Sequence, residues 1–281
     1  MERLSAIEGR SANNQVAEQL VVAQSYLATP AFVGRSEELA RVQSRTLRAL
    51  RKHGAVVLVT GERGAGRTRF LEACVLDAKL QGYMGLRADA EDGAQGDYGT
   101  LQRILLQLQQ MAPELAQTLL APELPVLGHV MPELLAGHVV ALATFAYPGA
   151  VRTAVQEATQ RVLLAAAEHI PLLIAIDDVP RCDEPSLAAL ALFSRAIERA
   201  RIVILASAVG GELDKSASTL KMLITNASSL ALPCLTEAQS EELLGSIFGV
   251  RPELTALARR LHSLSSGSPR ETLVTAQTPP A

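Results

Sequence analysis

The sequence has no tryptophan, and aromatic residues make up only 3% of its 281 residues. A surface that stacks nucleic-acid bases, or a cage of aromatic rings around a ligand, is therefore not expected. The charges nearly balance, with 29 Asp and Glu residues against 26 Lys and Arg residues. Binding of nucleic acid through bulk positive charge is not indicated, and the sequence gives no direct nucleic-acid signal.

Cysteine is also scarce, and the three cysteines, Cys74, Cys182 and Cys234, lie far apart. This spacing excludes a disulfide framework and a CxxC metal site, so a reducing, cytoplasmic location is expected.

The N-terminus leads into no apolar signal core. Residues 134–151 carry no Asp, Glu, Lys or Arg. They are at the short limit for a membrane span and contain Pro148, so we interpret them as a buried helical segment and expect no membrane contact.

What the sequence has in quantity is aliphatic residues, which suit helices packed on a buried sheet. Apolar runs of strand length alternate with helical patterns. Strands are expected at residues 55–60, 83–88, 171–176, 201–207 and, more briefly, 229–232. Helices are expected at about 14–27, 36–52, from the glycine-rich turn to 80, 98–168 with breaks at its prolines, 184–199, and throughout the chain after Pro233. This alternation predicts a parallel sheet covered on both faces.

Further local signals refine this outline. Residues 89–97 are acidic and are interpreted as a loop. Thr236 and Gln239 fit a capping box, Pro252 is expected to open a further helix, and Gly267-Ser268-Pro269 is expected to end it. In a parallel sheet, ligands bind outside the carboxyl ends of the strands, so functional residues are expected just after Thr60, Ile176 and Leu205.

A glycine-rich turn follows the first strand directly. Residues 61–68 read Gly-Glu-Arg-Gly-Ala-Gly-Arg-Thr and match the phosphate-loop pattern G-x-x-x-x-G-K-[ST] at every defined position except the lysine. Glycines at positions 61, 64 and 66 let the backbone N–H groups approach an anion, and the following helix presents its positive end. Thr68 would supply a hydroxyl to Mg²⁺. The G-x-G-x-x-G dinucleotide pattern fails, because its third glycine would fall at Arg69.

Arg67 stands where this pattern has lysine. Arginine keeps the positive charge but is longer, planar and fork-shaped, so it does not replace a compact ammonium group conservatively. It can hold a phosphate without placing charge correctly on a developing transition state. Nucleotide binding is therefore a safer prediction than hydrolysis, which we expect to be slow or absent.

Two carboxylates end the second strongly apolar strand. Asp177 would hold Mg²⁺ beside Thr68, and Asp178 would face the attacking water as a base or positioning group. An ordinary cap or loop pair is the alternative for such acids taken alone, but the phosphate loop favours the functional interpretation.

Taken together, these motifs resemble those of P-loop NTPase modules of the STAND and origin-recognition-like AAA ATPase type. The segment Phe32-Val33-Gly34-Arg35-Ser36-Glu37-Glu38-Leu39 resembles the hhGRExE box of this group, and residues 177–187 are similar to its acid pair and the segment after it. Gly267-Ser268-Pro269-Arg270 resembles the GxP element of the helical lid. The likeness covers about residues 30 to 276, and it departs from the group at Arg67 and at Pro180-Arg181, where His-Trp is common.

The resemblance implies roles for residues outside the phosphate loop. The Val33-Gly34-Arg35 box would lie against adenine, and Pro269 would approach the base from the lid. Ser207, at the end of the third strand, would sense the γ-phosphate, and Arg270 would act as a second sensor, although a strand-end cap and a solvated helix residue are the plain alternatives. The full set of expected nucleotide-binding residues is Val33, Gly34, Arg35, Gly61, Gly64, Ala65, Gly66, Arg67, Thr68, Arg69, Ser207, Pro269 and Arg270.

The sequence thus predicts an α/β fold, namely a P-loop NTPase three-layer sandwich with a parallel central sheet and a small C-terminal helical lid. The expected domains are an N-terminal helical arm or linker at 1–29, the NTPase core at 30–233, and the lid and tail at 234–281. The expected ligands are ATP or ADP with Mg²⁺.

The expected function is that of a nucleotide-dependent switch whose output is the angle between core and lid or the assembly state. A protein partner or self-association is expected. One alternative is a degenerate interaction module that keeps the fold with little or no nucleotide binding. Another is an active ATPase that remodels a partner. The sequence leaves enzymatic activity open.

Overall fold

The structure, a computed structural model, describes residues 30–137, 139–215, 218–249 and 251–277. The chain forms two compact units. The sheet unit comprises residues 37–62 and 67–232, and the helical unit comprises the described residues among 1–36, 63–66 and 233–281. The helix expected at about 14–27 lies outside the described residues.

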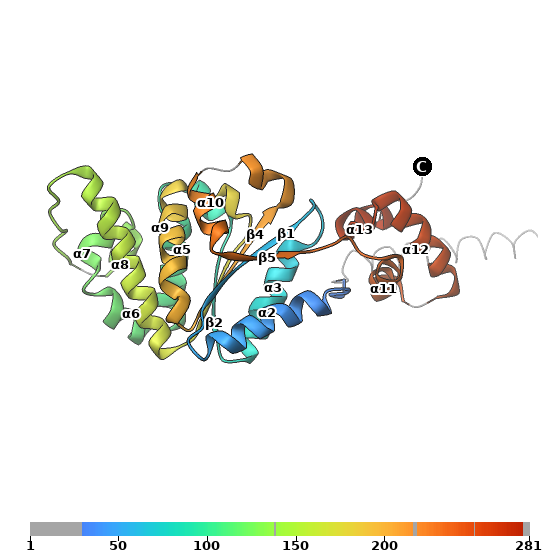
Figure 1. Ribbon diagram of the computed structural model, residues 1–281, viewed down its shortest axis with the longest axis horizontal. Coiled ribbons are helices and arrows are strands. Elements are labelled where there is room, and N and C mark those ends of the chain that lie inside the picture. Colours follow the sequence, from blue (N-terminus) through green and yellow to red (C-terminus); the bar gives the residue numbers. More distant parts are fainter. Residues whose placement is uncertain (1–29, 138, 216–217, 250, 278–281) are drawn as a thin grey trace, which may run out of the picture. The chain divides into compact units, whose positions relative to one another are not determined.

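The sheet unit is built on five parallel strands, as the alternation of the sequence predicts (Figure 1). They are β1 (Ala55–Gly61), β2 (Met84–Ala88), β3 (Leu172–Ile176), β4 (Ile202–Val209) and β5 (Ala227–Ala231). Their order across the sheet is β2-β3-β4-β1-β5. Of the three central strands, β3 and β4 are buried along almost their whole length and β1 is buried over its middle. Helices cover both faces of the sheet, and continuous apolar runs are typical of strands buried in this way.

Helices fill the connections between the strands. Those of the sheet unit are α2 (Ser36–Ala49), α3 (Arg67–Leu80), α4 (Ala90–Ala94), α5 (Gly99–Met111), α6 (Pro113–Leu120), α7 (Leu124–Leu127), α8 (Pro148–His169), α9 (Glu184–Ala196) and α10 (Ser218–Thr225). Short 3₁₀ turns are η1 (Pro132–Leu135), η2 (Val179–Arg181), η3 (Ile197–Arg199) and η4 (Gly210–Lys215).

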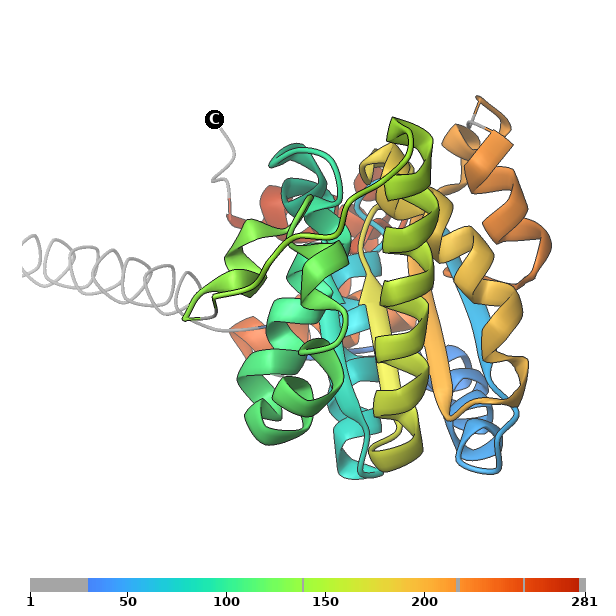
Figure 2. The same ribbon diagram turned by 90° about the vertical axis from the view of Figure 1, so that its left-hand side faces the viewer.

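The two faces of the sheet have separate apolar cores. Side chains of α2 and α3, such as Val42 and Phe70, pack with Val57, Val59 and Leu205 on one face. The larger core on the other face contains α5 to α10 (Figure 1). Figure 2 shows α6, α7 and α8, in green to yellow-green, on the side of the unit away from α2. The sheet unit is therefore layered as expected, helix on sheet on helix.

Two expectations for this unit are wrong. The acidic segment 89–97 is not only loop, because Asp89 and Asp92 form a reciprocal capping box that starts α4. Residues 136–147 form no helix or strand among the positions described, and Val139 and Leu142 are exposed. Pro148, which was expected to interrupt a buried helix, is instead the first residue of α8.

The described part of the chain contains no helix that is both long enough and apolar enough to cross a bilayer. The longest of the described helices, α8, has 22 residues, and its polar side chains include Arg152, Glu157 and Arg161.

The helical unit contains α11 (Glu237–Phe248), α12 (Pro252–Ser265) and α13 (Pro269–Gln277). The predicted capping box of Thr236 and Gln239 is present at the start of α11, and Pro252 opens α12 as expected. The expected end at Gly267-Ser268-Pro269 is correct for α12, but the same proline begins α13, because proline suits the first turn of a helix.

Candidate functional site

A hydroxyl–carboxylate cluster lies at the carboxyl ends of β3 and β4 in the sheet unit. Thr68 donates a hydrogen bond from Oγ1 to Oδ2 of Asp177 at 2.6 Å. The other oxygen of the same carboxylate, Oδ1, accepts a hydrogen bond from Oγ of Ser207, which is fully buried. Thus three residues predicted separately from the phosphate loop, the acid pair and a strand end are in direct contact.

The register of the sheet explains this meeting. Ile176 of β3 is paired with Ala206 of β4, so the next residues along the two strands, Asp177 and Ser207, are neighbours. Ser207 is also paired with Val59 of β1, which leads two residues later into the glycine-rich turn. The N–H of Asp177 donates to the carbonyl of Ala88 at 2.9 Å and holds the start of the acid pair to the end of β2.

Asp178 has a strained backbone and an unsatisfied side chain. Its φ of 55° and ψ of 52° are left-handed, and such a conformation in a non-glycine residue is often found at functional sites. Its N–H donates to Oγ of Ser207 at 2.9 Å. One carboxylate oxygen, Oδ1, is buried with no hydrogen-bond partner among the described residues, and Oδ2 is 3.7 Å from Nη1 of Arg181. The free oxygen can accept a hydrogen bond from a ligand or a water molecule.

Arg67 and Arg69 lie in the first turn of α3, where the N–H groups of a helix favour anions. Nη1 of Arg67 is buried and has no hydrogen-bond partner in the described part of the chain. A buried guanidinium nitrogen without an acceptor is unfavourable unless an anion is bound. This orphaned donor therefore fits a phosphate group.

The middle of the glycine-rich turn belongs to the helical unit. Gly64 and Gly66 have φ angles of +82° and +87°, which side chains larger than hydrogen disfavour. The N–H of Arg270 donates to the carbonyl of Gly64 at 3.2 Å. A Cβ atom added to Gly64 would lie 2.7 Å from Oγ of Ser268. The turn therefore requires glycine both for its conformation and for close packing against the start of α13.

The segment that was expected to lie against adenine is also held to this turn. Arg35 is 4% exposed and donates from Nη2 to the carbonyl of Ala65 at 3.1 Å. Val33 packs with Leu235 and Leu243 in a small apolar core. Arg35 thus has a local partner in the turn, which sequence reasoning did not foresee.

A polar cavity opens beside Thr68 and Asp177. It has a volume of about 460 Å³, and it is also lined by Arg87 of β2, Arg103 and Gln107 of α5, and acidic residues of α4. The side chain of Gln107 accepts from the N–H of Arg87 at 2.8 Å. None of these residues was predicted as functional, because their positions in the sequence match no motif and only the fold brings them to this edge.

The donor set at the cluster fits magnesium. The Thr68 hydroxyl and the Asp177 carboxylate supply hard oxygen ligands, which Mg²⁺ prefers, and this ion usually uses only one or two protein groups. The residues described contain no group of three or more His, Cys, Asp and Glu side chains that could hold a metal by themselves.

A sequence model of the family described as "AAA ATPase domain" matches residues 31–205. No protein of curated function matches the chain.

The fold is similar to those of several solved structures. The Aeropyrum pernix ORC2 protein, in a structure titled as ADPNP–ADP complexes, has 18% identity and a TM-score of 0.54, with 89% of this chain and 63% of that chain covered. The Aeropyrum pernix ORC1 protein in complex with DNA has 16% identity and a TM-score of 0.52, with 89% and 60% covered. Cdc6p from Pyrobaculum aerophilum has 12% identity and a TM-score of 0.52, with 87% of this chain and 62% of that chain covered. This chain therefore spans about three fifths of the length of these relatives in structure.

Proposed function

Because a family model covers more than half of this chain, the chain belongs to the AAA ATPase domain family, and we propose that it binds ATP or ADP with Mg²⁺ as a regulatory switch. The observation that carries the proposal is the contact of Thr68 and Ser207 with the two oxygens of Asp177. The match to a structure whose title names adenine nucleotides supports the choice of nucleotide.

In this proposal the backbone of Gly61 to Thr68 binds the phosphates, and Arg67 donates to them from its free Nη1. Thr68 and Asp177 would hold Mg²⁺, which would neutralise phosphate charge. Ser207 orients the Asp177 carboxylate, and the free oxygen of Asp178 would accept a hydrogen bond from the attacking water.

Other roles in the proposal come from the family resemblance. Val33, Gly34, Arg35 and Pro269 would contact adenine, with Arg270 near the phosphates. Residues 30–233 would be the nucleotide-binding core and residues 234–281 the lid, with 1–29 an arm or linker. The nucleotide state would change the lid conformation or the assembly state, because ATP and ADP make different contacts with the two states.

Hydrolysis is proposed to be slow or absent. Transition-state stabilisation depends on placing charge on the transferring phosphoryl group, and Arg67 presents a planar fork where a compact ammonium is usual. The same substitution is the observation that favours the second candidate, a degenerate interaction module without useful nucleotide affinity.

Calorimetric titration of ATP into the purified chain tests nucleotide binding. We expect saturable binding that weakens when EDTA removes Mg²⁺, and we expect Asp177→Asn to abolish this dependence on Mg²⁺. Asp97→Asn is the control, because Asp97 is an exposed acid of the same unit outside the cluster. Absence of saturable binding at millimolar ATP would reject the proposal in favour of the degenerate module.

Two further measurements separate the remaining alternatives. If the chain is an active ATPase, it releases phosphate, and Asp178→Asn abolishes release while binding is kept. If it is a switch, hydrogen exchange or sedimentation differs between the ATP-bound and ADP-bound chain. Identical exchange and identical sedimentation in the two states would contradict the switch.

A further inference from the structure

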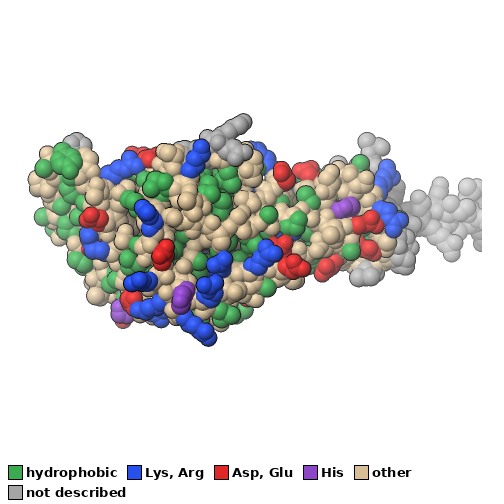
Figure 3. Space-filling model, viewed as in Figure 1, with side chains coloured by type: hydrophobic (Ala, Val, Ile, Leu, Met, Phe, Trp, Pro, Cys, Tyr) green, Lys and Arg blue, Asp and Glu red, His purple; other side chains and the backbone are tan. Residues whose placement is uncertain are grey.

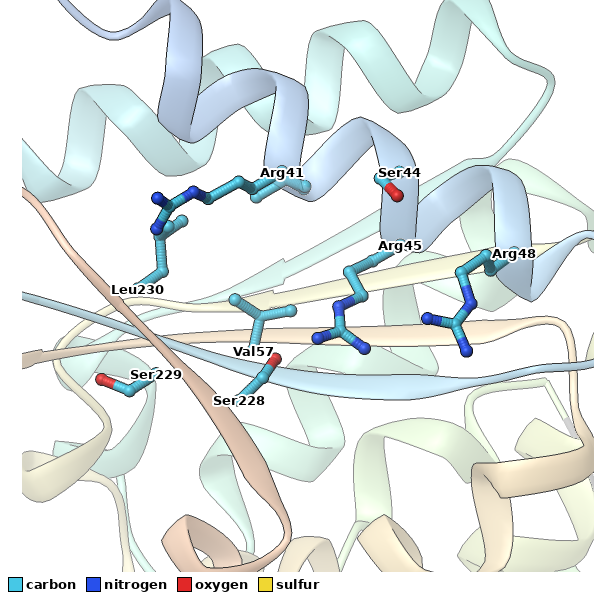
Figure 4. Close-up of a pocket in the computed structure, with 9 residues that line it drawn as sticks. Arg41, Ser44, Arg45, Arg48, Val57, Ser228, Ser229 and Leu230 are labelled. Atoms are coloured by element: carbon cyan, nitrogen blue, oxygen red, sulfur yellow. The ribbon is translucent and has the colours of Figure 1, made fainter.

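A second pocket of the sheet unit lies between α2 and β5, and it is lined by three arginines. Arg41, Arg45 and Arg48 extend from α2 toward the strands (Figure 4). Val57 of β1 and Leu230 of β5 form an apolar floor, and Val42 of α2 and serines of α2 and β5 complete the lining. The pocket volume is about 320 Å³.

The pocket is positively charged and contains no acid. No carboxylate is among its lining residues, and none of the three arginine side chains forms an ion pair or a hydrogen bond with the part of the chain that the structure describes. By contrast, Lys52, which follows the same helix, forms an ion pair in which its Nζ is 2.8 Å from Oε2 of Glu168. Figure 3 shows Lys and Arg side chains gathered over the region where Figure 1 draws α2. Because unpaired like charges in one pocket repel each other, binding of an anion would stabilise the cluster of three arginines.

The pocket lies at the edge of the sheet. β5 is the last strand in the order and is paired only with β1 among the described strands. The N–H of Leu232 donates to the carbonyl of Thr60 on the β1 side at 2.7 Å. Backbone groups of successive strand residues point to opposite sides, so those of Ser229 and Ala231 point outward from the sheet. Both residues are exposed, and an open edge of this kind can pair with another strand.

The spacing of the arginines suits side chains of an added strand. Arg41 and Arg45 are one helical turn apart, or about 6 Å along the helix axis. In an extended chain, alternate side chains share a face and are about 6.6–6.8 Å apart. In a strand added to β5, every second side chain would lie on the sheet face that carries Ser228 and Leu230 and is covered by α2. Acidic side chains at these alternate positions would therefore lie close to the arginines.

We propose that the edge of β5 and Arg41, Arg45 and Arg48 of α2 form a docking site for an extended acidic segment of a partner protein. The backbone of the segment pairs with Ser229 and Ala231, and carboxylates at alternate positions enter the arginine pocket. A peptide explains the open edge and the apolar floor together with the charge, whereas a phosphate polyanion needs only the charge. This site is separate from Thr68 and Asp177, and the proposal does not depend on nucleotide binding.

Fluorescence anisotropy with the full chain tests this site. The probe is a labelled peptide in which glutamate alternates with valine. The comparison probes are the same sequence with glutamine in place of glutamate, the acidic peptide with alternate backbone nitrogens methylated, a DNA duplex and inorganic polyphosphate. We expect saturable, salt-sensitive binding of the acidic peptide alone, since methylation removes the backbone donors and glutamine removes the charge.

Variants separate the two parts of the site. Arg41→Gln, Arg45→Gln and Arg48→Gln should each weaken peptide binding by about two- to fivefold, as for partly exposed ion pairs, and the triple variant should lose most of the affinity. Arg51→Gln is the matched control, because Arg51 is exposed just after the same helix but does not line the pocket. Ser229→Pro removes an outward N–H that β1 does not use, so the chain should fold and lose peptide binding.

Several results would overturn the proposal. These are no binding of the acidic peptide, equal binding by the methylated peptide, or a triple arginine variant that binds like the Arg51 control. Binding of DNA or polyphosphate that needs the three arginines but is unaffected by Ser229→Pro would assign the pocket to phosphates instead. If Ser229→Pro fails to fold, the methylated peptide alone decides whether the edge is used.

Discussion

At the scale of single residues, Arg67 is where the sequence departs from the phosphate-loop pattern. Its buried Nη1 has no partner within the described chain. We expect Arg67→Ala to weaken ATP binding by about tenfold or more, because a charge-assisted hydrogen bond contributes about 1.5–3 kcal/mol. We expect Arg67→Lys to retain most of the affinity and to raise phosphate release. Titration and a phosphate-release assay on the same preparations measure both effects, and equal behaviour of all three proteins would show that Arg67 does not contact phosphate.

The three cysteines differ in burial, and we expect them to differ in reactivity. Burial raises the pKa of the Cys182 thiol to about 12 and the pKa of Cys74 still further, whereas Cys234 is exposed. Only the thiolate is nucleophilic, so raised pKa values keep two thiols protonated at pH 8. We expect a chromogenic thiol reagent to modify Cys234 rapidly and the other two only after unfolding. Cys234→Ser should then remove the fast phase, and a remaining fast phase would contradict this assignment.

At the scale of elements, Asp183 connects two helices. Its carboxylate caps α9 by accepting from the N–H of Ser186 at 2.8 Å, and it also accepts from the N–H groups of Tyr98 and Thr100 at 2.8 and 3.1 Å. We expect Asp183→Ala to reduce the free energy of unfolding by about 2–4 kcal/mol, because a cap is lost and further backbone donors lose their acceptor. Urea denaturation measures the change.

The control for Asp183 is Asp97→Ala, which removes an exposed acid close to the same helix start and should change stability by less than about 0.5 kcal/mol. A similar loss in both variants would attribute the effect to general charge and not to the three hydrogen bonds.

Elements with one strong local signal could be predicted from the sequence, and those decided by distant contacts could not. The β-branched run of residues 55–60 predicts a buried strand, and β1 is present. Residues 136–147 are as apolar as many helices, but those of them that the structure describes lie outside regular structure, and Val139 is exposed. The sheet order also could not be read from the sequence, since β1 is flanked by β4 and β5 from far along the chain.

Some contacts of the candidate site could likewise be predicted from the sequence, and others could not. Motif spacing predicts that Thr68 and Asp177 lie side by side, and they are in contact. Ser207 was expected at the end of a strand, and it contacts Asp177 from within β4, which continues to Val209. The contact of Arg35 with the carbonyl of Ala65 could not be predicted, because it depends on the path of the chain between them. The arginine pocket did have a signal, namely three arginines at helical spacing on α2, but only the structure shows that they lie beside an open strand edge.

At the scale of the whole molecule, the two units differ in the size of their cores. The sheet unit contains two large apolar cores, whereas the helical unit depends on two small ones around Leu244 and Val33. Protection from hydrogen exchange follows local stability. We expect amides of α11 to α13 to exchange faster than those of β1, β3 and β4, as measured by mass spectrometry. Equal protection in both units would show that they unfold together.

The strand order has a consequence for synthesis on the ribosome. Ala55 of β1 is paired with Val203, and Val56 is paired with Ala227. At roughly 5–20 residues per second, β1 emerges roughly 7–30 s before its first partner strand does. During this interval its apolar, β-branched residues have no neighbouring strand, and a chain that is released early exposes them permanently. Translation speed and chaperone access between β1 and β4 should therefore affect the yield of folded protein more than they would in a sheet built from consecutive strands.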